Sequence, residues 1–130
     1  VPIIIVIIGE GASGGALGIG MGDRILCFEN TWYSVISPEG CATILFRDAS
    51  RASEAADSMM VTAKDLKEMG IADTIMPEPI GGTHQDYDKS AETLKDAILK
   101  SFSDLNKIDP DKRIENRIEK YEKMGKWSDG

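Results

Sequence analysis

Residues 3–17 read Ile-Ile-Ile-Val-Ile-Ile-Gly-Glu-Gly-Ala-Ser-Gly-Gly-Ala-Leu, an apolar run that passes directly into a glycine-rich segment. Six consecutive branched aliphatic residues are typical of a strand that is buried on both faces of a sheet. We therefore expect a strand over residues 3–8, a glycine loop from Gly9 to Gly15 and a glycine-spaced helix over 14–21. Such an order of elements indicates an α/β fold.

The remainder of the chain continues to alternate between strand and helix patterns. Short apolar runs predict strands at 25–28, 33–36 and 71–76, and helical patterns occupy 38–46, 49–60 and 63–69, with Thr62 as an N-cap. From residue 90, apolar residues recur in steps of three and four, and Asp109-Pro110 opens a last helix with an apolar stripe of Ile114, Ile118 and Tyr121. The alternation predicts a largely parallel sheet.

Composition and charge narrow the class of protein. The chain has 130 residues, of which 42% are hydrophobic and 28% charged, as in a globular domain. A net charge of −7 argues against a nucleic-acid or anionic-membrane partner. Cys27 and Cys41 form no CxxC pair, so we expect reduced thiols, no metal site and a cytoplasmic protein.

The N-terminal end lacks the features of a targeting segment. It carries neither a basic region nor a small-residue cleavage site, and its apolar run is too short to span a bilayer. With no initiator Met, we expect a soluble fragment that begins at a core strand.

The glycine loop fits a dinucleotide-binding pattern. Gly9, Gly11 and Gly14 match GxGxxG, and Glu29 follows where a ribose-binding acid would lie. Glu10, however, would place a carboxylate beside the pyrophosphate. The helix that follows also contains so many glycines that it must lie close to other backbone.

The same loop fits the nucleophile elbow of a serine hydrolase. Gly11-Ala12-Ser13-Gly14-Gly15 matches GxSxG, and Asp73 and His84 follow in the order of a catalytic triad. Against this, a single histidine beside Gly81-Gly82 is more often structural, and an elbow does not need glycines along its helix.

A third interpretation uses the backbone amides of the glycines. Glycines at the start of a helix expose free N–H groups that can hold a developing oxyanion. The alternative is that the glycines only permit close packing between the helix and the sheet.

Three motifs, in this order, resemble those of acetyl-CoA carboxylase carboxyltransferase alpha subunits. They are residues 7–17 around the glycine loop, residues 33–42 (Tyr-Ser-Val-Ile-Ser-Pro-Glu-Gly-Cys-Ala) and residues 77–84 (Pro-Glu-Pro-Ile-Gly-Gly-Thr-His). Ala12 and Thr83 stand where the family is expected to have Gly and Ala. The resemblance covers essentially the whole chain.

The resemblance implies a crotonase-like fold, in which ββα units repeat in a superhelix. Family members are more than twice as long as this chain. Residues 1–89 would therefore form the C-terminal part of the carboxyltransferase core, and residues 90–130 a C-terminal helical extension.

The resemblance also implies a reaction, the first step of fatty acid synthesis. A carboxyl group would pass from biotin on a carrier protein to acetyl-CoA, giving malonyl-CoA, in an α2β2 heteromer whose beta subunit binds acetyl-CoA. An enzyme of the same fold acting on another acyl-CoA is the alternative. By resemblance, the Gly14 and Gly15 amides hold the biotin ureido oxygen, and no metal is needed.

The resemblance places further residues in the substrate site. These are Gly11, Ser13, Ser37, Glu39 and His84. For Glu39 the alternative is a helix-start residue favoured by the helix dipole, and for His84 it is a residue that orders its loop.

Overall fold

A central parallel sheet organises residues 1–125, which are the residues that the structure, a computed structural model, describes. Its strands are β1 (Ile4–Ile7), β3 (Arg24–Phe28) and β5 (Thr74–Met76), in the order β1-β3-β5. Two short strands, β2 (Glu10–Ala12) and β4 (Trp32–Ser34), form a second parallel pair. The expected parallel α/β architecture is confirmed.

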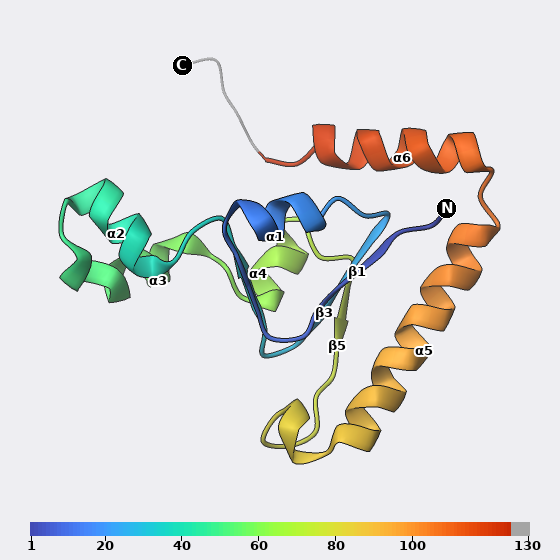
Figure 1. The fold of residues 1–130 in the computed structure, drawn as a ribbon, viewed down its shortest axis with the longest axis horizontal. Coiled ribbons are helices and arrows are strands. Elements are labelled where there is room, and N and C mark those ends of the chain that lie inside the picture. The colour runs from blue at the N-terminus through green and yellow to red at the C-terminus, as the bar shows by residue number, and fades with distance from the viewer. Residues whose placement is uncertain (126–130) are drawn as a thin grey trace.

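Residues 1–125 also contain six α-helices and two 3-10 turns. The helices are α1 (Ser13–Ile19), α2 (Pro38–Phe46), α3 (Ala52–Met59), α4 (Ala63–Glu68), α5 (Tyr87–Asn106) and α6 (Pro110–Glu122). The turns are η1 (Ala49–Arg51) and η2 (Thr83–Gln85). Of the helices, α2 and α3 lie to one side of the strands (Figure 1).

The chain contains a repeated ββα unit. The first unit is β1-β2-α1 and the second is β3-β4-α2. Because β1 pairs with β3 and β2 pairs with β4, the second unit stacks directly on the first. The fold is thus the crotonase-like superhelix that the sequence led us to expect.

The two faces of the sheet carry separate cores. On one face Ile25 and Cys27 pack with Leu66 of α4, and on the other Leu26 and Phe28 pack with Leu94 and other residues of α5. Alternate residues of β3 enter opposite cores, as the pleat of a strand requires. The three layers are therefore α4, the sheet and α5.

The double-sided burial expected for residues 3–8 is found at β3 instead. Strand β1 lies at the edge of the three-stranded sheet, and Ile4 to Val6 are only half buried. The central strand β3 is buried along Ile25–Phe28.

Several expected boundaries need correction. Residues 10–12 of the expected loop form β2, the expected helix 49–60 begins as the 3-10 turn η1, and the strand over 71–76 is confined to β5. Helix α5 begins at Tyr87, where the Asp86 side chain accepts a hydrogen bond from Lys89 N.

Local capping chemistry was predicted correctly. Thr62 and Asp65 form a capping box at the start of α4, and the Asp109 carboxylate accepts from two amides of the first turn of α6, which begins with Pro110. The apolar stripe expected on α6 does not pack as a stripe, however, because Ile114 and Ile118 are exposed.

Both cysteines are free thiols. Cys27 is buried in β3, and burial raises the pKa of its thiol. Within residues 1–125, no helix combines the length and apolar character needed to cross a bilayer.

Candidate functional site

The junction between β2 and α1 holds the glycine motif. Pairing of Gly11 with Tyr33 in β4 fixes the course of β2. A Cβ atom at Gly11 would lie 2.6 Å from Cδ2 of Tyr33, so this position requires glycine for packing. The expected substrate role of Gly11 is thus accompanied by a clear structural one.

Ser13 turns the chain sharply from β2 into α1. Its φ of 72° lies in the left-handed region, which is uncommon for a residue with a side chain. Such strain typically persists only where the surrounding structure fixes it, and it clusters at functional sites. The turn places Gly14 and Gly15 at the exposed start of α1.

The amides of Gly14 and Gly15 are free to bind a ligand. The first N–H groups of a helix have no partner within it, and Ala12, the N-cap, provides no side-chain acceptor. Among the described residues, no other group accepts a hydrogen bond from either amide. Two unpaired donors therefore lie next to each other at the surface.

The glycines of this region fall into two groups. Cβ atoms added at Gly14 or Gly18 would meet nothing within 4 Å, and one at Gly15 would meet only Ser13 Oγ, at 3.9 Å. By contrast, Cβ atoms at Gly20 and Gly22 would lie 2.3 Å from Tyr33 Oη and 2.6 Å from Ile5 Cγ1.

Close packing therefore explains Gly11, Gly20 and Gly22, which lie outside α1, but not the glycines within α1. The expectation that the whole helix lies against other backbone is wrong for the positions inside α1, within the part of the chain that the structure describes. Positions 14 and 15 have room for a side chain, so packing within residues 1–125 does not require glycine there.

Two tyrosine hydroxyls bond to the backbone of α1 and of the segment that follows it. Tyr33 donates its hydroxyl to the Ala16 carbonyl oxygen at 2.6 Å. Tyr121 of α6 lies 2.7 Å from the Gly20 oxygen and 2.8 Å from the Gly22 oxygen. Burial raises the pKa of both phenols, so both remain protonated hydrogen-bond donors at neutral pH.

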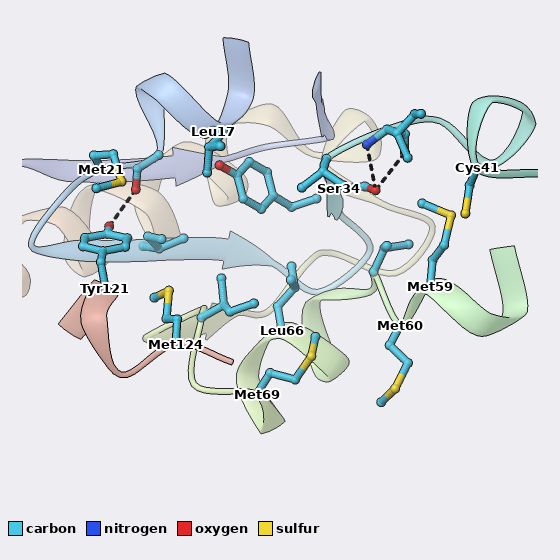
Figure 2. Close-up of a pocket in the computed structure, with 17 residues that line it drawn as sticks. Leu17, Met21, Ser34, Cys41, Met59, Met60, Leu66, Met69, Tyr121 and Met124 are labelled. Carbon is cyan, nitrogen blue, oxygen red and sulfur yellow. Dashed lines mark hydrogen bonds between the residues drawn. The ribbon is translucent and has the colours of Figure 1, made fainter. Parts of the chain in front are cut away.

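An apolar cavity of about 330 Å³ lies beside the C-terminal half of α1 (Figure 2). Its walls come from α1, β4, α3, α4 and α6, and they include Leu17, Met21, Met60, Leu66, Met69 and Met124. Gly14 and Gly15 are not among the lining residues. The cavity therefore borders the helix at the end away from the free amides.

The remaining expected site residues have structural partners of their own. Ser37 caps α2 by accepting from Gly40 N at 3.2 Å, and Glu39 lies exposed in the first turn of that helix. His84 lies exposed in η2, with a ring nitrogen 3.0 Å from Gln85 Nε2. The loop there is ordered by Glu78, which accepts from Asn30 N at 3.0 Å and Thr83 N at 3.1 Å.

The structure does not assemble a hydrolase triad. Asp73 is bonded to Ile25 N and to Lys120, at 2.7 and 2.5 Å, rather than to His84. In the view of Figure 1, helix α1, which carries Ser13, lies above the sheet, whereas the segment after β5 that carries His84 lies below it.

The dinucleotide interpretation is also wrong. Strand β2 separates Gly9 from Gly14, so the three glycines do not form the single loop between strand and helix that a pyrophosphate site needs. Among residues 1–125, no three His, Cys, Asp or Glu side chains gather closely enough to hold a metal ion.

The family model described as "Acetyl co-enzyme A carboxylase carboxyltransferase-like" matches residues 1–125. The acetyl-coenzyme A carboxylase carboxyl transferase subunit alpha of Chlorobium luteolum is 51% identical over 129 residues, which cover 99% of this chain and 38% of that protein. The subunit of the same name from Bacillus cereus is 53% identical over 98% of this chain and 40% of its own length. The chain thus spans about two fifths of the length of these relatives.

A solved structure shares the fold. A chain of a Pseudomonas malonate decarboxylase hetero-tetramer, crystallised with coenzyme A, superposes with a TM-score of 0.51 over 73% of this chain and 41% of that one. At 16% identity, the likeness concerns the fold alone.

Proposed function

Because the chain belongs to the acetyl co-enzyme A carboxylase carboxyltransferase-like family, we propose that it forms the biotin-facing part of an acetyl-CoA carboxylase carboxyltransferase. The complete protein would be the alpha subunit and would act with a beta subunit in an α2β2 heteromer in the cytoplasm. Residues 1–89 would belong to the catalytic core and residues 90–130 to a helical extension, of which residues 126–130 lie outside the described part of the chain.

The observation that carries this proposal is the pair of free amides at Gly14 and Gly15. They belong to adjacent exposed residues and lack an acceptor among the described residues. Backbone donors held in this way can stabilise an oxygen atom on which negative charge develops. Losing one such donor typically costs about a hundredfold in rate or more.

The residues present fit the ureido group of biotin, which a carrier protein would bring to the site. When bound, carboxylated biotin supplies the carboxyl group that acetyl-CoA receives to become malonyl-CoA. Gly14 and Gly15 would donate their N–H groups to the ureido oxygen. Since neither glycine has a side chain, that oxygen can approach the backbone directly.

The other residues of the junction would prepare these donors. Ser13, through its left-handed backbone, directs the chain into α1 without a side-chain cap that would compete for the amides. Gly11 allows β2 to pack on Tyr33. Ser37, Glu39 and His84 would border the approach of the carrier, and acetyl-CoA would bind to the beta subunit.

Reconstitution tests the proposal. The full-length protein, its beta subunit and the carboxylated carrier protein are mixed with acetyl-CoA, and malonyl-CoA is quantified. We expect malonyl-CoA only when both subunits are present. Equal transfer by the beta subunit without the alpha protein would contradict the proposal.

A further inference from the structure

Helix α1 has little that fixes its position. It is seven residues long, and three of these are glycines, each of which costs about 1 kcal/mol in helix propensity relative to alanine. Isolated helices of this length are unstable in water. None of its residues is buried, and Leu17 and Ile19 are mostly exposed. Apolar packing alone therefore cannot hold the helix in one orientation.

Two tyrosine hydroxyls compensate for this weak packing. Both reach carbonyl oxygens at the C-terminal side of α1, Tyr33 from β4 and Tyr121 from α6. The Tyr121 hydroxyl is close to both Gly20 O and Gly22 O, so it fixes the C-cap of α1 together with the chain that leads into β3. Figure 2 shows one of these two bonds from Tyr121.

Helix α6 is itself tied firmly to the sheet. Arg117 forms a two-pronged ion pair with Asp23, with Nε–Oδ1 at 2.9 Å and Nη2–Oδ2 at 3.2 Å. Asp23 is 4% exposed and also accepts from Ile3 N at 2.6 Å. One turn further on, Lys120 pairs with Asp73, whose carboxylate accepts from Ile25 N.

Tyr121 therefore projects from a rigid support. Its helix is bonded through Asp23 and Asp73 to the starts of β1 and β3. Because α6 is fixed in this way, the hydrogen bond from the Tyr121 hydroxyl also fixes the end of α1. Tyr121 is not part of either apolar core cluster. Its hydroxyl is thus tied to the placement of α1 rather than to the packing of the sheet.

We infer that Tyr121 is a positioning residue for carboxyl transfer: its hydroxyl holds α1 so that the Gly14 and Gly15 amides point at the oxygen they stabilise. This inference rests on the proposed function. It gives helix α6, about a hundred residues from the glycine motif, an indirect part in the reaction, through the position of α1.

The test compares three single-hydroxyl deletions in the full-length protein assembled with its beta subunit. Tyr121→Phe removes the bond to Gly20 and Gly22 and keeps the ring. Tyr33→Phe removes the bond to Ala16. Tyr87→Phe is the matched control, because Tyr87 is 74% exposed and no hydrogen bond of its hydroxyl occurs among residues 1–125.

Two readouts are combined for each variant. Amide hydrogen exchange of residues 13–20 reports the order of α1, and steady-state kinetics separate kcat from the KM for acetyl-CoA. For Tyr121→Phe we expect exchange to rise and kcat to fall by about fivefold, the scale of one neutral hydrogen bond. The KM for acetyl-CoA should not change. Tyr33→Phe should act in the same direction, and Tyr87→Phe should change neither quantity.

Two results would overturn the inference without touching the proposed function. One is unchanged exchange over residues 13–20 in Tyr121→Phe, whatever happens to kcat. The other is an equal effect of Tyr87→Phe. Faster exchange with unchanged kcat would also overturn it, and would in addition count against the catalytic role proposed for the α1 amides.

Discussion

Ser13 and the two glycines after it form the smallest unit of the site. Ser13 accepts a left-handed backbone that costs about 1–2 kcal/mol for a residue with a side chain. Gly14 and Gly15 leave their amides uncovered. The side chain of Ser13 has no catalytic partner at the positions where a hydrolase would need one, since Asp73 is paired with Lys120.

The serine hydroxyl should therefore be dispensable. We predict that Ser13→Ala in the assembled full-length enzyme keeps carboxyl transfer within about tenfold of the wild-type rate, because no general base among residues 1–125 contacts the hydroxyl. The same preparations are treated with a fluorophosphonate probe. Covalent labelling of Ser13, together with loss of transfer in Ser13→Ala, would indicate a serine nucleophile instead.

Helix α6 shows how an element can be positioned by charge rather than by apolar contact. Its expected stripe of Ile114 and Ile118 is exposed, whereas Arg117 and Lys120 face the sheet and bind Asp23 and Asp73. The spacing of apolar residues along a helix cannot predict ion pairs of this kind. The aspartates lie 94 and 47 residues from their partners in the sequence.

Breaking the buried pair should weaken the whole fold. We predict that Arg117→Met lowers the unfolding free energy of the full-length protein by about 3–5 kcal/mol, since the buried Asp23 carboxylate loses its counter-charge. Lys112→Met is the control, because Lys112 pairs with Glu115 at 3.0 Å on the exposed side of the same helix. That exposed pair is worth about 1 kcal/mol or less.

Urea titration followed by circular dichroism measures both variants. Equal midpoints for Arg117→Met and Lys112→Met would show that the Asp23 contact does not hold α6.

At the scale of the whole molecule, the features that could be predicted are those that depend on residues close together in the sequence. The first strand and the caps at Thr62 and Asp109 follow from local patterns, and the structure confirms them. Strand β2 was missed because Glu10–Ala12 has no strand propensity of its own and exists through its pairing with β4.

The candidate site also contains residues that could be predicted from the sequence and residues that could not. Ser13, Gly14 and Gly15 could be found from their spacing, together with a family resemblance that the comparisons confirm. Tyr33 and Tyr121, which hold α1, could not be found, because their acceptors are backbone oxygens of residues distant in the chain. Every residue has a backbone carbonyl oxygen, so the residue types in the sequence do not show which one accepts such a bond.

The central claim is that the Gly15 amide, freely accessible, takes part in carboxyl transfer, and Gly15→Val tests it most directly. The new Cβ has space in the fold, with Ser13 Oγ at 3.9 Å as its nearest neighbour. The valine side chain should nevertheless crowd an oxygen that approaches the backbone at this residue. Gly18→Val is the matched control one turn along, where an added Cβ meets nothing within 4 Å.

Malonyl-CoA formation is measured in both variants after circular dichroism and subunit assembly have been verified. We predict that Gly15→Val lowers the rate by at least about a hundredfold while Gly18→Val stays near wild type. A Gly15→Val enzyme that assembles normally and turns over at the wild-type rate would contradict the account.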